Sequence, residues 1–337
     1  MKVADLGEAG LIDLLAQLIE KSRDRKFTSW QQLIIGIGDD AAAWQGDNSI
    51  QLAKVDSLRE NVHFTLGTFP WKELGWKALA INLSDIAAMG GLPRYALVSL
   101  ALPGETEVDD VVDLYQGMIG CAGQFGVAII GGDTDNAPLV DITVMVLGNT
   151  KSPRQTLLTR SSAQPGDKIA ITGELGAAAA CVQMLKRNLQ FDRETTISLK
   201  NAFFHPIPRL PEGQLLVEQG VRTAIDISDG LILDLGHICK ASGVGARIEV
   251  ARVPISPPVK KGFGERALEL ALSGGEDYEL LFTAGTEVMD KVRAKASCPI
   301  TVIGEILAEK AGEITLVDEN GKPFHLTKTG WDHFAQR

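Results

Sequence analysis

The chain has 337 residues, of which 45% are apolar and 23% charged, the composition of an ordinary soluble globular protein. Lys and Arg total 33 against 43 Asp and Glu, and the resulting net charge of −10 argues against a broad basic surface for nucleic acid. The four cysteines show no CxxC spacing, the N-terminus shows no signal pattern, and no apolar run approaches the roughly 18 residues of a membrane span. We therefore expect a cytoplasmic protein whose thiols are free.

The first half of the chain alternates helical and strand-like patterns, which predicts an α/β domain with mixed strand order. The glycines and proline of the segment 90–93 mark the end of its longest helix. The expected elements are a helix over 6–19, strands over 33–37 and 50–58, a helix over 71–89, a strand over 95–102, a helix over 108–125, and strands over 127–130 and 139–147.

A polar, turn-rich stretch over 148–165 predicts a domain boundary, because a chain of this length exceeds what one core usually supports. We place the domains at 1–150 and 151–337. Ser228 or Asp229 is expected to cap the helix that follows them. The second domain should contain a strand over 168–172, helices over 176–187 and 211–219, a strand over 223–227, a helix over 231–241, a strand over 246–250, a helix over 263–272, a strand over 278–283, and then one helix and two strands.

Several strands run into aspartate, and this is the main chemical signal of the sequence. A single aspartate beside glycine is as often an N-cap or turn residue as a ligand. Asp56, however, lies within a strand pattern. Asp85 lies near the C-terminal end of a helix, where the helix dipole disfavours an anion, so its position indicates a cationic partner. Together the aspartates indicate a site for Mg²⁺, which takes oxygen ligands. The set comprises Asp39, Asp40, Asp56, Asp85, Asp133, Asp226 and Asp229.

Other candidates are weaker when taken alone. The glycine pairs at 90–91, 131–132 and 274–275 could bring backbone N–H groups to phosphate oxygens, but such pairs are also common in turns. His63 and Trp331 could contact an organic substrate or simply pack, and Arg160 could bind a phosphate or remain solvated. No P-loop, dinucleotide-binding or zinc-binding pattern is present.

Seven segments of the sequence are distinctive when taken in order along the chain. They are 36–40 (GIGDD), 82–90 (NLSDIAAMG), 130–134 (IGGDT), 158–160 (LTR), 225–231 (IDISDGL), 273–280 (SGGEDYEL) and 330–334 (GWDHF). These segments resemble the thiamine-monophosphate kinases, which belong to the AIR-synthetase-like (PurM-like) superfamily. The resemblance runs from residue 36 to residue 334, and the SGGEDYEL run with the GWDHF tail is its most specific part.

The resemblance implies ATP-dependent and Mg²⁺-dependent phosphorylation of thiamine monophosphate to thiamine diphosphate. It also implies two α/β domains, an N-terminal one for ATP, Mg²⁺ and dimerisation and a C-terminal AIR-synthetase-like one. Members of the family form homodimers by pairing their N-terminal sheets, with active sites in clefts at that interface. Carried onto this sequence, the Mg²⁺ ligands are Asp40, Asp56, Asp85, Asp133, Asp226 and Asp229; the ATP contacts are Gly132, Asp133, Arg160, Ser228 and Tyr115; and the substrate contacts are His63, Glu276 and Trp331.

One departure from the family pattern bears on the metal site. Two small hydroxyl residues that help hold metal in the family are Lys54 and Val55 in this sequence. Lys54 should share a strand face with Asp56, while Val55 should point to the opposite face. The Lys54 ammonium could replace an ion or occlude its site.

A phosphate acceptor is already ionised near neutral pH, so the reaction needs no strong general base. We therefore expect direct in-line transfer, with Asp133, Asp226 and Asp229 as the catalytic residues that act through bound Mg²⁺. Two alternatives remain: another ATP-using enzyme of the same superfamily, and a non-catalytic Mg²⁺-nucleotide-binding protein.

Overall fold

The computed structural model describes residues 1–37, 42–308, 311–326 and 330. The chain divides into two compact units, one made of residues 1–86 and 91–154 and the other of residues 87–90 and 155–337. We describe each unit by itself.

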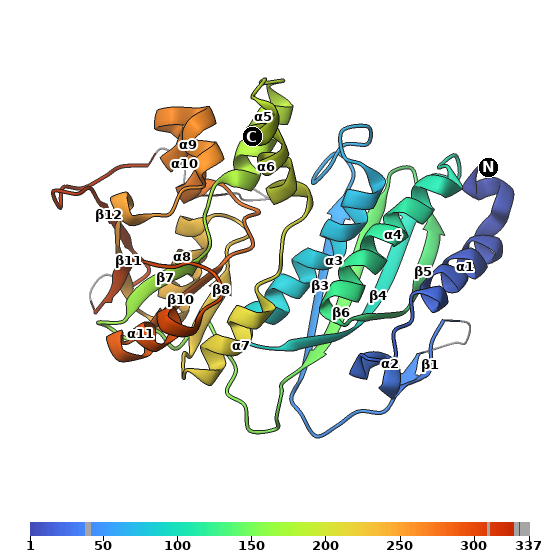
Figure 1. Ribbon diagram of the computed structural model, residues 1–337, viewed down its shortest axis with the longest axis horizontal. Coiled ribbons are helices and arrows are strands. Elements are labelled where there is room, and N and C mark those ends of the chain that lie inside the picture. The colour runs from blue at the N-terminus through green and yellow to red at the C-terminus, as the bar shows by residue number, and fades with distance from the viewer. Residues whose placement is uncertain (38–41, 309–310, 327–329, 331–337) are drawn as a thin grey trace. The chain divides into compact units, whose positions relative to one another are not determined.

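The first unit is built on a four-stranded sheet with strand order β3-β6-β4-β5 (Figure 1). β4 and β5 run parallel, and the other two pairs are antiparallel, which confirms the mixed sheet expected from the sequence. The elements of this unit are α1 (Val3–Lys21), α2 (Thr28–Gln32), β1 (Leu33–Ile35), β2 (Ala43–Trp44), β3 (Gln51–Arg59), α3 (Trp71–Ala88), β4 (Leu92–Leu102), α4 (Val108–Phe125), β5 (Ala128–Asn136) and β6 (Asp141–Asn149).

The helices α3 and α4 lie side by side with their backbones in contact (Figure 1). A Cβ atom at Gly75 would lie 1.8 Å from the Leu114 carbonyl oxygen, and one at Gly117 would lie 1.8 Å from that of Lys72. The two helices can approach this closely only because neither glycine carries a side chain. This packing fixes α3, the helix that carries Asp85.

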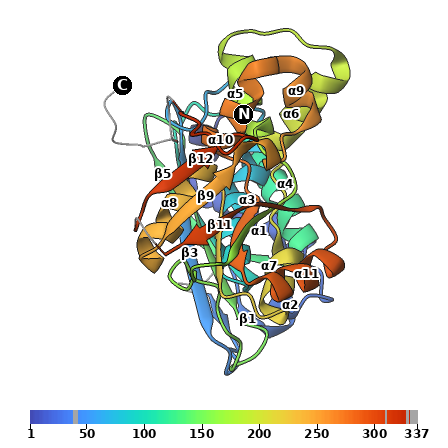
Figure 2. The same cartoon turned by 90° about the vertical axis from the view of Figure 1, so that its left-hand side faces the viewer.

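The second unit contains a six-stranded sheet with strand order β12-β9-β11-β7-β10-β8, in which only the β12–β9 pair is parallel. Three of these strands, β12, β9 and β11, are labelled in Figure 2. The strands of the unit are β7 (Lys168–Thr172), β8 (Thr223–Asp226), β9 (Gly245–Glu249), β10 (Leu280–Ala284), β11 (Ile300–Leu307) and β12 (Ile314–Val317). Its helices are α5 (Ala177–Lys186), α6 (Arg193–Phe204), α7 (Leu210–Glu218), α8 (Leu231–Ser242), α9 (Pro257–Phe263), α10 (Ala267–Ser273) and α11 (Thr286–Lys295), with the short 3₁₀ turns η1 (Val250–Arg252) and η2 (Gly264–Arg266).

Two apolar cores lie on opposite faces of this sheet. Ile169 and Ile171 of β7 pack with Leu235 of α8 in one core, while Ala170, between them on the strand, packs with Leu216 of α7 in the other. Alternate residues of one strand therefore pack into different cores, because successive side chains of a strand point to opposite faces of the sheet. The unit is an α/β domain with helices over both faces of its sheet.

The sequence prediction missed α2, β2, α6 and α9, and three further details of it were wrong. β5 does not stop at the glycines but continues to Asn136, and the helix expected over 263–272 is broken at Gly264, whose φ is 54°. α6 was missed, although Asp192 caps it by accepting a hydrogen bond from the Thr195 N–H at 3.0 Å. The capping expected of Ser228 or Asp229 is also absent, as described below. No helix among the described residues is long and apolar enough to cross a membrane.

Candidate functional site

The acidic segment that ends β8 is the best-defined part of the candidate site. Asp226 is the last residue of β8 and is only 3% exposed, and it lies opposite Leu280 of β10 in the sheet. The Ile227 N–H donates to the Glu279 carbonyl oxygen at 2.8 Å, so the strand pairing continues past Asp226. The backbone on either side of this buried carboxylate is therefore fixed.

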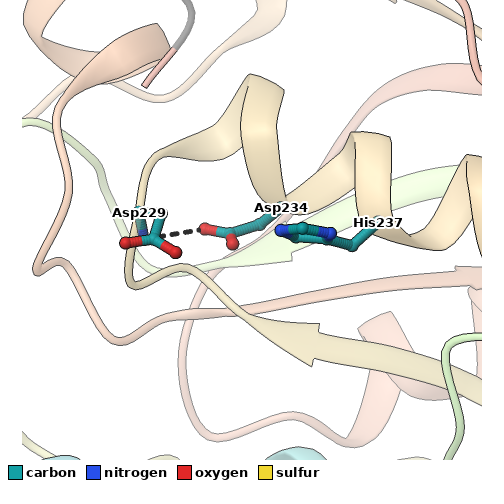
Figure 3. A group of neighbouring side chains, drawn as sticks. All are labelled: Asp229, Asp234 and His237. Carbon is teal, nitrogen blue, oxygen red and sulfur yellow. Dashed lines mark hydrogen bonds between the residues drawn. The ribbon is translucent and has the colours of Figure 1, made fainter. Parts of the chain in front are cut away.

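Asp234 of α8 holds the turn that follows, in place of the expected cap. One of its carboxylate oxygens, Oδ2, accepts hydrogen bonds from the N–H groups of Ser228, Asp229 and Gly230 at 3.0, 3.1 and 3.1 Å. Figure 3 draws the bond from Asp229. The residue at the N-cap position is Gly230, with φ of 121° and no side-chain cap. A side chain one turn inside the helix thus accepts hydrogen bonds from the turn that precedes the helix, whereas an N-cap side chain would accept from N–H groups of the first helical turn.

Negative charge is crowded at this turn. The pKa of Asp234 is raised to about 8, first because the carboxyl group is buried and then because Asp226 and Asp229 are charged. The ligand atoms of Asp229, Asp234 and His237 lie within 4.8 Å of one another (Figure 3). The carboxylate oxygens of Asp229 and Asp234 are ligands that suit a hard divalent cation such as Mg²⁺, whereas the imidazole nitrogen of His237 suits a transition metal.

The sequence prediction named Asp226 and Asp229 but missed Asp234 and His237. The available signal was their spacing, because residues three apart on a helix share one face. Asp229 lies two residues before the same helix, so the spacing relates Asp234 and His237 to each other but not to Asp229.

The loop between α10 and β10 carries the candidate substrate residue Glu276. Its backbone lies against the β8 turn, because the Glu276 N–H donates to the Ser228 carbonyl oxygen at 2.8 Å and the Tyr278 N–H donates to that of Ile227 at 2.9 Å. Both residues have left-handed backbones, with φ of 69° at Glu276 and 51° at Tyr278. Such conformations cost free energy for residues other than glycine and persist only where the surroundings enforce them.

Two acids in the same loop, the partly buried Asp277 and the buried Glu279, have structural partners. The Gly176 N–H, at the start of α5, donates to both carboxylate oxygens of Asp277 at 3.0 and 2.9 Å. Arg209 donates from Nε and Nη2 to Glu279 at 2.6 and 2.5 Å. Two acids of this loop therefore help to anchor it, and the backbone of Glu276 lies beside the β8 turn.

Arg160 lies in the same unit, on the segment that runs along the edge of β8. Thr159 pairs with Thr223 of β8 in a parallel bridge, and the Arg160 carbonyl oxygen accepts a hydrogen bond from the Ser242 hydroxyl at 2.8 Å. The Arg160 residue itself is exposed. Its backbone is thus fixed while its guanidinium group can reach solvent or an anion.

In the first unit, Lys54 joins two of the predicted metal ligands. Its Nζ lies 3.2 Å from Oδ2 of Asp56 and 3.1 Å from Oδ2 of Asp85. Burial lowers the pKa of Lys54, but the charges of Asp85 and Asp56 outweigh this effect and raise it above its ordinary value. The expectation that Lys54 shares a strand face with Asp56 is confirmed, and the cationic partner expected for Asp85 is Lys54.

Val55 lies between Lys54 and Asp56 on β3, and 53% of it is exposed. The residue opposite it on β6 is Met145, whereas Lys54 and Asp56 lie opposite the buried residues Val146 and Val144. The Val55 side chain therefore points to the other face of the sheet, away from the acidic pair.

Asp133 and its neighbour Gly132 lie on β5, at the opposite edge of the sheet from Asp56. The register joins Asp56, Val144, Val98 and Gly132 in one row across the four strands. At about 4.8 Å between neighbouring strands, the two ends of that row are roughly 14 Å apart. One ion cannot be ligated by both Asp56 and Asp133, because metal–oxygen distances are only about 2.0–2.1 Å for Mg²⁺.

The remaining predicted contacts of the first unit vary in accessibility. His63 is partly buried, and its Nδ1 accepts a hydrogen bond from the Arg59 N–H at 2.9 Å. Tyr115 lies on the buried face of α4 and is 5% exposed, and burial raises the pKa of its hydroxyl group. Asp39, Asp40 and Trp331 lie outside the described residues.

The glycine pairs turn out to serve backbone geometry. The Gly90 and Gly91 N–H groups donate to the carbonyl oxygens of Ala87 and Ile86 and so end α3, as the sequence predicted. The Gly274 N–H donates to Leu270 at the end of α10, and Gly132 is required because a Cβ there would lie 1.8 Å from the Val98 carbonyl oxygen. The N–H groups of Gly90, Gly91 and Gly274 are thus already used.

The two units and their acidic strand ends define a protein of the AIR-synthase-related class. The model of the AIR synthase related protein N-terminal domain matches residues 38–150, and that of the C-terminal domain matches residues 164–317. The two-domain fold expected from the sequence is confirmed by these matches and by the solved structures below.

Within that class, the chain belongs to the thiamine-monophosphate kinase family. It is 39% identical over 330 residues to the thiamine-monophosphate kinase of Escherichia coli K12, covering 94% of this chain and 97% of that one. The crystal structure of the Stenotrophomonas maltophilia enzyme of this name is 34% identical, with a TM-score of 0.79 over 91% of this chain and 95% of the other. A solved structure described as AaThiL complexed with AMPPCP and TMP is 30% identical, with a TM-score of 0.76 over 99% of both chains.

Proposed function

We propose that this protein transfers the γ-phosphoryl group of ATP to thiamine monophosphate in a Mg²⁺-dependent reaction that yields thiamine diphosphate. The observation that carries the proposal is the acidic turn after β8, which backbone hydrogen bonds hold against the Glu276 loop. Relatives of the same family support the substrate, since one of them was solved with AMPPCP, an ATP analogue, and TMP, which we read as thiamine monophosphate.

The proposal gives each predicted residue a role. Asp226 and Asp229 in the second unit, and Asp40 and Asp133 in the first, are the proposed Mg²⁺ ligands. Asp56 and Asp85, the other two predicted ligands, contact the Lys54 ammonium and are discussed below. Gly132, Asp133, Arg160 and Ser228 are the proposed ATP contacts, and His63, Glu276 and Trp331 the proposed thiamine monophosphate contacts. We leave Tyr115 out of the ATP contacts, because its place on the buried face of α4 already accounts for it.

The chemistry asked of the protein is mainly electrostatic. Two phosphate-bearing anions must approach each other, and bound Mg²⁺ would neutralise their oxygens. Arg160 can donate two parallel hydrogen bonds to a phosphate group. The acceptor oxygen of thiamine monophosphate is ionised near neutral pH, so the side chains bind and orient the substrates and no protein group has to remove a proton.

Transfer is proposed to be direct and in line, without a phosphorylated enzyme. The purified protein should convert thiamine monophosphate and ATP into thiamine diphosphate and ADP in equal amounts, as measured by mass spectrometry, and a chelator should abolish the conversion. Protein incubated with ATP alone should gain no phosphoryl mass; a trapped phosphoenzyme would overturn direct transfer.

Two other functions would give different results in the same assay. Another kinase-like enzyme of the superfamily would consume ATP with a different acceptor in an acceptor screen and leave thiamine monophosphate unchanged. A binding protein would take up Mg²⁺ and ATP without forming ADP.

We also propose that the protein is a cytoplasmic homodimer that pairs its N-terminal sheets. β3 is an edge strand, and its Val55 forms an exposed apolar pair with Met145 of β6, the two residues being 53% and 37% exposed. Apolar pairs on an open sheet face next to a free edge favour association with a second copy. Light scattering after size-exclusion chromatography should give twice the mass of one chain; the mass of a single chain at micromolar concentration would contradict the proposal.

A further inference from the structure

The ion pairs around Lys54 bear on how many metal ions this chain binds. Lys54 and Asp56 lie two residues apart on β3, and Asp85 lies in the last turn of α3. The Lys54 Nζ is almost equally distant from one oxygen of each carboxylate, at 3.2 and 3.1 Å. An ammonium group that contacts two carboxylates in this way occupies the position that a shared cation would take.

The arrangement is built into the fold. The register of β3 against β6 sets the face of Lys54 and Asp56, and the close packing of α3 on α4 sets the position of Asp85. The Lys54 and Asp85 side chains are 30% and 22% exposed, so neither swings freely in solvent. Asp85 also lies at the negative end of the α3 dipole, which strengthens its need for a positive charge.

We propose that the Lys54 ammonium acts as a built-in cation that holds the Asp56–Asp85 pair in place of a divalent metal ion. A divalent ion ligated by these two oxygens would have to displace the ammonium or lie against it, and the two positive charges would repel each other. The chain then binds one divalent ion fewer than its acidic residues could hold. This inference rests on the proposed function only in taking Asp56 and Asp85 as positions that could hold Mg²⁺ if Lys54 were absent.

The test counts bound ions and needs no turnover. Mn²⁺ serves as the probe, because the signal of free Mn²⁺ in electron paramagnetic resonance gives the number bound per chain, with and without the analogue AMPPCP. The variant Lys54→Met removes the charge and keeps the length of the side chain. We expect it to bind one more Mn²⁺ per chain than the parent protein does.

Three variants make this result specific. Lys54→Arg keeps the positive charge and should bind the parent number of ions. The double variant Lys54→Met with Asp56→Asn should lose the extra ion, because one of its two ligands is gone. Lys26→Met, which removes an exposed lysine of the same unit, should leave the count unchanged.

Thermal unfolding provides a second readout. Without metal, Lys54→Met leaves two carboxylates side by side, so its melting temperature should fall below that of the parent and recover when Mn²⁺ is added. An equal Mn²⁺ count in the parent and in Lys54→Met, with equal responses of the melting temperature, would overturn the inference. A lack of kinase activity in the parent would count against the proposed function but would not change the ion count.

Discussion

The two units of the molecule hold their acidic side chains in opposite ways. In the first unit Lys54 contacts Asp56 and Asp85, so much of the negative charge is already balanced. In the second unit Asp226 and Asp229 lie close enough to Asp234 to help raise its pKa to about 8, and three backbone N–H groups share one Asp234 oxygen. The comparison teaches that the number of aspartates in a unit does not determine how many metal ions the unit binds. What determines it is the negative charge that the protein's own groups do not balance.

The largest expected effect separates the two acidic groups directly. Asp226→Asn should lower kcat by about 10²–10³-fold, the size seen when one strong electrostatic contact to a transition state is lost. Asp56→Asn should cost about tenfold or less, because its charge is shared with Lys54. Steady-state kinetics at saturating Mg²⁺ would measure both, with the exposed Asp290→Asn as control. Equal losses in the two variants would break the comparison.

A smaller effect is expected when the hydrogen bonds that Asp234 accepts from the turn after β8 are removed. Asp234→Ala removes the acceptor of three N–H groups, and a buried donor left without an acceptor costs about 1–3 kcal/mol. Asp234→Asn keeps an oxygen at the same position and should retain most of the stability. Urea unfolding would measure the free energies, and kcat with KM for ATP would show whether the turn still positions its ligands. If Asn and Ala behave alike, the three hydrogen bonds do not position the turn.

The smallest effect concerns Gly132, which the first unit needs for packing. Gly132→Ala places a Cβ 1.8 Å from the Val98 carbonyl oxygen, so the strands must shift, at about 1–3 kcal/mol. Gly123→Ala on α4 is the matched control, since no atom lies within 4 Å of its Cβ and alanine favours a helix there. Denaturant midpoints would decide between them. Unchanged stability in Gly132→Ala with a raised KM for ATP would give Gly132 a purely ligand-binding role.

Much of this structure was predictable from the periodicity of apolar residues and from the glycine and turn residues at the ends of helices and strands. α4 and β7 were predicted with the boundaries that the structure shows, because glycine or turn residues mark their ends. The alternation of side chains on a strand gave the shared face of Lys54 and Asp56, and the helix dipole indicated a cationic partner for Asp85. These are local rules, and they act between residues close in sequence.

The parts that could not be predicted depend on distant partners. That the partner of Asp85 is Lys54 depends on how β3 meets α3, and the anchoring of Asp277 by Gly176 joins residues 101 positions apart. The role of Asp234 was hidden for another reason. Asp in a helix interior normally predicts exposure or a cap, whereas here tertiary burial and the preceding turn decide its use.

The left-handed backbone of Glu276 has a consequence for the heat tolerance of the protein. A left-handed conformation costs a residue with a Cβ about 1–2 kcal/mol, and glycine largely avoids that cost. Glu276→Gly should therefore raise the melting temperature while removing the carboxylate proposed to contact the substrate. Selection for function would retain glutamate at this position at the expense of stability, so a search for more thermostable variants should find its gains here and lose activity with them.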